Sequence, residues 1–301
     1  MIRTAAVVSL LSVGPALAGD SVMWGETGRT GALRVMQAAP GQDPVLVHRV
    51  PPHRRRTLAG LEASSERFAV KVSTIESRSE DVVAFTLRAW GGPFKGPVEP
   101  VRAPCGRADT IAVDGDRIAG GSTCGVAIHG PAGVTTIPGG DIHEVALAGR
   151  YVAWTGDEVA VHDVVTGATV VRLTPRDVGS PAFEEVAVQP DGAVAFSYAT
   201  GAGQHLAWAA PGTPGARRLD TAPRFSGLRA AGGRLLYERR TGPREGRRVL
   251  VLRSPEAGPA RRLARFTARR VRIGDLDLEP GRAAWAVRRQ GRAVRIVVRE
   301  L

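Results

Sequence analysis

The sequence predicts an all-β protein, a seven-bladed β-propeller of four-stranded antiparallel blades, with six or eight blades as the alternatives. A short phrase recurs seven times at spacings of about 35 to 49 residues: a turn, then small apolar residues that usually end in an aromatic. Short β-type runs fill each interval, and glycine (37) and proline (21) are plentiful enough for many tight turns. A period in this range with four short strands per unit is typical of propellers. The seven copies begin at Gly19, Ser65, Asp114, Gly149, Asp191, Gly233 and Gly281.

The clearest repeat unit lies between residues 144 and 173. We name its expected strands A to D from the inside of the ring outward, and they cover 144–148, 151–154, 159–163 and 169–173. Turn residues separate consecutive runs, among them Gly149, Gly156 and Gly167. Short runs of this kind, bounded by glycine and aspartate, predict antiparallel strands joined by hairpins.

The later units repeat this scheme. The next two units place their strands at 185–188, 193–196, 204–208 and 216–219, then at 228–230, 235–237, 248–252 and 261–263. The last unit supplies 275–278, 283–285 and 293–298 and stops one strand short of a complete blade.

An aromatic residue closes strand B in most units. A single blade cannot bury both of its faces, so we expect these side chains to pack between neighbouring blades. A ring of aromatics that cages a ligand is the alternative, but a cage would need only one or two of them. The residues concerned are Trp24, Trp154, Phe196, Tyr237 and Trp285.

Two phrases resemble known propeller repeats. Residues 188–196 (VQPDGAVAF) resemble the turn of the TolB-type, WD40-like repeat, and residues 161–167 (VHDVVTG) resemble a phrase shared by WD40-like and quinoprotein-like repeats. Both carry turn chemistry, because Asp-Gly and Thr-Gly accept positive φ in tight hairpins. The resemblance implies a propeller, and a TolB-type relative would imply a protein–protein adaptor in the cell envelope. It assigns no functional residue.

The first 18 residues fit two incompatible interpretations. A positive charge at Arg3, an apolar run and Ala16-Leu-Ala18 match a short secretory signal peptide, which would leave 19–301 as a single propeller domain. The same segment parallels residues 145–154, and it would then supply strand A of the first blade. Residues 4–10 would complete the last blade as its strand D and close the ring. A true start upstream of residue 1 would reconcile the two interpretations.

Two cysteines occupy matched positions around the third repeat. Cys105 precedes its strand A and Cys124 lies between its strands B and C, and these two loops emerge on the same face of a propeller. We therefore predict a disulfide, which favours an oxidising compartment and an exported protein. Two unpaired thiols in a cytoplasmic protein are the alternative. No second cysteine or histidine lies at metal-ligand spacing from either, so no metal site is predicted.

Arginine dominates the charge of the chain. The formal net charge is +12, and of 41 basic residues all but Lys71 and Lys95 are arginine. Such a bias is typical of a GC-rich genome, and the dense basic tails of nucleic-acid binders are absent, so we predict no nucleic-acid partner. One loop-rich face nevertheless gathers arginines suited to gripping carboxylates or phosphates. These candidate binding residues are Arg54, Arg55, Arg56, Arg239, Arg240, Arg244 and Arg247.

The sequence contains no recognised catalytic or cofactor-binding motif, and no apolar stretch of transmembrane length. The leading hypothesis is therefore an exported, monomeric, non-enzymatic propeller that binds a protein or an anionic envelope polymer and needs no cofactor. The alternative is a hydrolase or lyase with its site in the central channel, lined by strand A and the loops that precede it. Its candidate residues are Glu144, Glu184, Glu185, Asp275 and Asp277.

Overall fold

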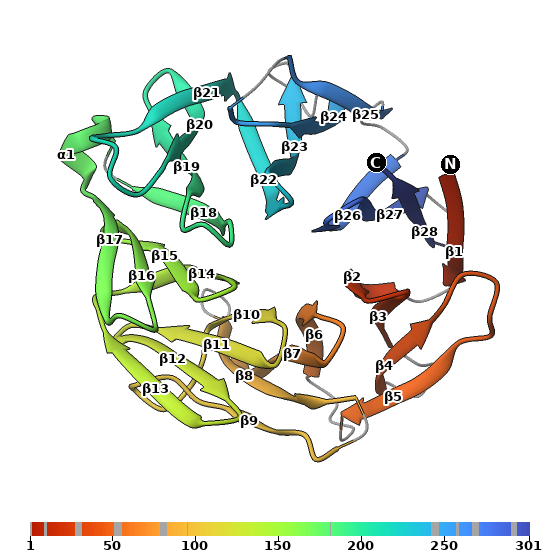
Figure 1. The fold of residues 1–301 in the computed structure, drawn as a ribbon. Helices are drawn as coiled ribbons and strands as arrows, with labels where there is room; N and C mark the ends of the chain where they lie inside the picture. The colour runs from red at the N-terminus through yellow and green to blue at the C-terminus, as the bar shows by residue number, and fades with distance from the viewer. Residues whose placement is uncertain are drawn as a thin grey trace.

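Seven antiparallel sheets of four strands stand as blades around a central axis (Figure 1). The computed structural model describes residues 2–8, 11–27, 32–50, 56–78, 83–94, 96–180, 182–241, 247–256, 259–266, 271–289 and 294–301. Within these ranges the single helical element is α1 (Pro175–Val178), and no helix is long and apolar enough to cross a membrane. The predicted seven-bladed propeller is confirmed.

Each of the first six blades is one continuous stretch of chain, with its strands in sequence order from the inside outward. Blades 1 to 3 comprise β2 (Leu11–Ala18), β3 (Ser21–Thr27), β4 (Leu33–Ala38), β5 (Val45–Val50); β6 (Arg56–Ala63), β7 (Arg67–Arg78), β8 (Val83–Pro93), β9 (Glu99–Val101); and β10 (Thr110–Asp114), β11 (Arg117–Ser122), β12 (Gly125–Gly130), β13 (Gly133–Pro138). Blades 4 to 6 comprise β14 (Ile142–Ala148), β15 (Tyr151–Gly156), β16 (Val159–Asp163), β17 (Ala168–Leu173); β18 (Phe183–Val188), β19 (Val194–Thr200), β20 (Gly203–Ala209), β21 (Arg217–Ala222); and β22 (Arg224–Ala231), β23 (Arg234–Thr241), β24 (Arg247–Arg253), β25 (Arg261–Phe266).

The seventh blade joins the two ends of the chain. It contains β26 (Val271–Glu279), β27 (Arg282–Arg289), β28 (Val294–Glu300) and, as its outer strand, β1 (Ile2–Val8). β1 runs antiparallel to β28, with Ile2 opposite Arg299 and Val8 opposite Val294, and Figure 1 shows the two termini side by side. This pairing covers the open edge of β28, which would otherwise expose unpaired backbone groups.

The core is divided among the blade interfaces. The described buried residues form seven apolar clusters, and each cluster combines side chains of two neighbouring blades. The strand B aromatics belong to these clusters and are at most 3% exposed, as the sequence predicted. Blade 2 has no strand B aromatic in the predicted list. Its Phe68 packs in the cluster shared with blade 1, and its Ala69 packs in the cluster shared with blade 3. The aromatics confirmed as core are Trp24, Trp154, Phe196, Tyr237 and Trp285.

The phrase at residues 161–167 owes its shape to one buried carboxylate. Asp163 Oδ1 accepts hydrogen bonds from the backbone N–H groups of Val165 (3.0 Å) and Thr166 (3.4 Å). Asp163 Oδ2 lies 3.1 Å from Arg150 Nη2. These bonds hold the turn between β16 and β17, so the phrase has a structural role.

Candidate functional site

The innermost strands carry a ring of seven equivalent residues, six of which line the pocket at the channel. Alternate residues of a strand share a face, and the pairing of strands A and B gives the same position in every blade. Four blades carry alanine there, and three carry a charged residue. In blade order the ring is Ala16, Glu62, Ala112, Ala146, Ala187, Arg229 and Asp277.

The three charged members of this ring form a bridge across the channel. Arg229 Nη2 lies 2.8 Å from Glu62 Oε1, and Arg229 Nε lies 4.0 Å from Asp277 Oδ1. Glu62 belongs to β6 and Arg229 to β22, and these strands lie on opposite sides of the ring centre (Figure 1). We call Glu62, Arg229 and Asp277 the channel bridge. It lines a pocket of about 370 Å³, which also includes Glu144 and the turns between strands A and B.

Three acids at the channel, Glu62, Glu144 and Asp277, have raised pKa values. Burial raises the pKa of Glu62 to about 7 although Arg229 opposes the rise. Burial, helped by the Glu185 carboxylate, raises the pKa of Glu144 to about 7. Burial likewise raises the pKa of Asp277 to about 6, against Arg229. Glu62 in turn holds the pKa of Arg229 above its usual range, so the guanidinium stays charged.

Most of the acids considered for catalysis are engaged in hydrogen bonds. Glu185 accepts the backbone N–H groups of Gly227 (3.1 Å) and Leu228 (2.8 Å) from the next blade. Those two residues form a bulge in β22, where Gly227 has φ +68°, a conformation that favours glycine. Glu184 accepts a hydrogen bond from the Gln204 side chain within its own blade.

Two further acids tie the last blade to the first. Asp275 Oδ2 accepts the N–H of Gly14 (2.7 Å), and Asp277 Oδ2 accepts the N–H of Leu17 (2.5 Å). Both acceptors are on β26 and both donors are on β2. Glu144 differs from the other four candidates, because its carboxylate has no hydrogen bond or ion pair within the described residues.

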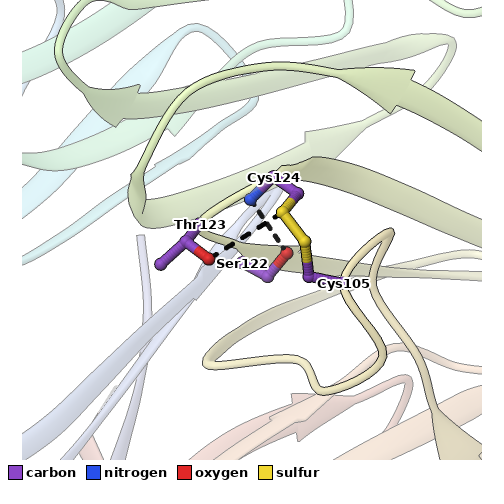
Figure 2. Close-up of a disulfide and its surroundings, with 4 residues drawn as sticks. All are labelled: Cys105, Ser122, Thr123 and Cys124. Atoms are coloured by element: carbon purple, nitrogen blue, oxygen red, sulfur yellow. Dashed lines mark hydrogen bonds between the residues drawn. A yellow bond between two sulfur atoms is a disulfide. The ribbon is translucent and has the colours of Figure 1, made fainter.

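The two cysteines form a disulfide (Figure 2). Their Cα atoms are 5.7 Å apart, within the range of about 4.4 to 6.8 Å that such a bond requires. The bond joins the segment before β10 to the turn between β11 and β12, where the Ser122 hydroxyl accepts the Cys124 N–H at 3.3 Å. Disulfides of this kind are typical of oxidising compartments.

The predicted arginine face divides between two blades. Arg56 begins β6 in blade 2, whereas Arg239, Arg240 and Arg247 lie in blade 6. Arg240 Nε is 3.5 Å from Glu238 Oε1 and is therefore paired. The remaining predicted residues, Arg54, Arg55 and Arg244, lie outside the described residues.

Arg239 and Arg247 line a second pocket, of about 330 Å³, which also contains Arg262 and Arg265. Asp220 of blade 5 is the one acidic residue among its described lining residues. We call this site the arginine pocket. Its described lining residues combine four positive charges with one negative charge.

Sequence reasoning did not find Glu62, Arg229, Arg262 or Arg265. Arg229 interrupts the apolar pattern of its strand, between Leu228 and Ala230, and alignment with Ala146 marks it as channel-facing. Glu62 can be found in the same way, by aligning its strand to Ala146. Arg262 and Arg265 carry no comparable signal, because arginine is frequent along the whole chain.

Comparison with known structures identifies the fold as that of WD40-type propellers. The WD40 β-propeller domain of Doa1 matches with a TM-score of 0.64 and 11% identity, over 99% of this chain and 96% of that chain. A chain of the Mitotic Checkpoint Complex matches with a TM-score of 0.59 and 12% identity, over 98% and 92%. At such identities the likeness shows the fold alone. No protein-family model and no curated protein matches the sequence.

Proposed function

We propose that this chain is an exported, non-enzymatic propeller that binds a protein or an anionic envelope polymer. One observation carries the proposal: most of the channel acids make hydrogen bonds inside the fold, whereas Arg262 and Arg265 of blade 6 are exposed. Glu185, Asp275 and Asp277 hold neighbouring blades together. Arg262 and Arg265 have no side-chain partner within the described residues. Free guanidinium groups on a surface are suited to carboxylate or phosphate groups of a partner.

The fold supports a binding role. Propellers present loops and turns from every blade on two broad faces, and a rigid scaffold of this kind positions contact residues well. One of the similar solved structures comes from a protein complex, the Mitotic Checkpoint Complex. A binding module of this type needs no reacting group in the channel.

Export is supported by the disulfide. Residues 2–8 and 11–18 supply β1 and β2, so we propose that the folded protein retains them. A monomer is sufficient for the proposed role, because each described blade interface is already filled within one chain.

A hydrolase or lyase in the channel is the second candidate. A general acid for use near neutral pH needs a raised pKa, and Glu144 has one while lacking an internal partner. Its carboxylate faces the same pocket as the channel bridge. Glu144→Gln therefore separates the two functions, since it removes the acid while preserving size.

Retention of envelope components by the immobilised full chain tests the proposal. We expect saturable retention of one protein or anionic polymer, unchanged in the Glu144→Gln protein, with that component chemically intact after incubation. Cleavage of the retained component by the native protein but not by Glu144→Gln would establish the enzyme instead. Absence of any saturable retention would contradict the binding function.

A further inference from the structure

The arginine pocket is built on one face of blade 6. Arg239 on β23 lies opposite Val249 on β24, and Val249 lies opposite Arg265 on β25. The neighbouring cross-strand pairs bring Arg247 opposite Thr241 and Arg262 opposite Val251. Four guanidinium groups from three strands therefore surround one pocket.

Arg239 is the anchored member of this set. Its Nη2 donates a hydrogen bond to the backbone oxygen of Thr221 (3.2 Å) and lies 3.6 Å from Asp220 Oδ1. Its Nε is buried and has no hydrogen-bond partner. A guanidinium held in this way by the protein keeps its orientation before a ligand arrives.

The single carboxylate of the pocket, Asp220, already accepts hydrogen bonds within the protein. Asp220 Oδ2 accepts the hydroxyl of Tyr237 (3.0 Å), and Asp220 Oδ1 accepts the N–H of Thr221 (2.8 Å). Arg247, Arg262 and Arg265 make no side-chain hydrogen bond or ion pair with any described residue. The pocket brings four positive charges and one negative charge together, and a bound anion would relieve the repulsion among the guanidinium groups.

We infer that the arginine pocket binds a phosphoryl group, as free phosphate or as a phosphate monoester. This inference deepens the proposed function, on which it rests, by naming the chemistry of the anionic partner. A net excess of three charges favours a dianion over a single carboxylate. Guanidinium forks also match the oxygens of a phosphoryl group bidentately, which lysine cannot do.

Titration calorimetry of the full chain with glycerol 3-phosphate, inorganic phosphate and acetate tests this inference. We expect both phosphoryl ligands to bind more tightly than acetate. Tighter binding of glycerol 3-phosphate than of inorganic phosphate would indicate an esterified group as the source, and the reverse order would indicate the free ion. No heat from either phosphoryl ligand at millimolar concentration, or acetate binding of equal strength, would overturn the inference.

Three single variants localise the binding. Arg262→Ala and Arg265→Ala should each weaken phosphoryl binding about tenfold or more, because a charged hydrogen bond is lost. Both side chains are exposed, so thermal unfolding should be unchanged. Arg261→Ala is the matched control, since Arg261 is an exposed neighbour on β25 outside the pocket, and it should change binding less than twofold. Equal weakening by Arg261→Ala would overturn the site.

The Arg262→Ala/Arg265→Ala protein distinguishes this inference from the proposed function. If it loses both phosphoryl binding and retention of the envelope component, both proposals are supported. If it loses phosphoryl binding but still retains that component, the pocket is not the contact with the partner, and the binding function stands. If the native protein binds phosphoryl ligands but retains no envelope component, the pocket stands and the proposed function fails.

Discussion

At the scale of single residues, acidic and basic side chains gather in different parts of the molecule. The acids of the channel lie among apolar side chains and hydrogen bond to backbone groups of adjacent blades, as Glu185 does with Gly227 and Leu228. Arg262 and Arg265 on the outer strand of blade 6 are exposed, and neither has an internal partner among the described residues. A chain with a net charge of +12 thus has an acidic centre and a basic exterior.

Glu62, Glu144 and Asp277 should make the protein more stable as the pH falls toward 5. Between their ordinary pKa values near 4 and the raised values of about 6 to 7, the folded state binds more protons than the unfolded state. The contribution of these groups to stability is therefore complete below the ordinary pKa and is lost as the pH rises through 7. Urea unfolding at pH 5 and pH 8 measures the difference.

Glu144→Gln provides the control for this pH dependence. The variant should be more stable than the native protein at pH 8, by on the order of 1 kcal/mol, because it removes a half-buried carboxylate that lacks a partner and has a raised pKa. The stability difference between pH 5 and pH 8 should shrink accordingly. An unchanged pH dependence in the variant would contradict the assigned burial of Glu144.

Trp154 should contribute much of the stability of the interface between blades 3 and 4. Its side chain is 3% exposed and packs with residues of blades 3 and 4, so Trp154→Ala should cost about 3 to 5 kcal/mol. Val165→Ala, at a side chain that is 72% exposed, is the control and should have little effect. Equal effects of the two substitutions on the urea midpoint would show that the interface is assigned wrongly.

At the scale of elements, the strands were largely predictable and the contacts between distant strands were not. Residues 159–163 form β16 as predicted, because a short alternating run between two turns leaves little choice of structure. The channel bridge pairs Glu62 with Arg229, 167 residues apart, and only the closed ring brings them together. The arginine pocket depends on a bulge between Leu250 and Val251 that shifts the register of β25, and no sequence signal marks it.

The disulfide should stabilise the segment that leads into blade 3. It closes a loop with a sequence separation of 19, so the Cys105→Ser/Cys124→Ser protein should lose about 3 kcal/mol in urea unfolding. Thr123→Ala, which keeps the disulfide and changes an exposed side chain, should unfold like the native protein. If the native protein unfolds identically with and without reductant, the bond does not form in solution.

At the scale of the whole molecule, the ring depends on the two ends of the chain. β1 completes the blade of β26, β27 and β28, and β2 is the inner strand of the next blade. Asp275 and Asp277 strengthen the same junction through the backbone of β2. Seven interface clusters form a closed circuit, so loss of one junction leaves two blade surfaces exposed.

Urea unfolding of a chain that begins at Gly19, compared with the full chain, tests this closed ring most directly. The shorter chain lacks β1 and β2 and therefore exposes the edges of β28 and β3. It also lacks the N–H groups of β2 that donate hydrogen bonds to Asp275 and Asp277. We expect the full chain to unfold in one cooperative transition and the shorter chain to aggregate or to unfold at a much lower urea concentration. A shorter chain that remains soluble and has the same urea midpoint would contradict closure of the ring by residues 2–18.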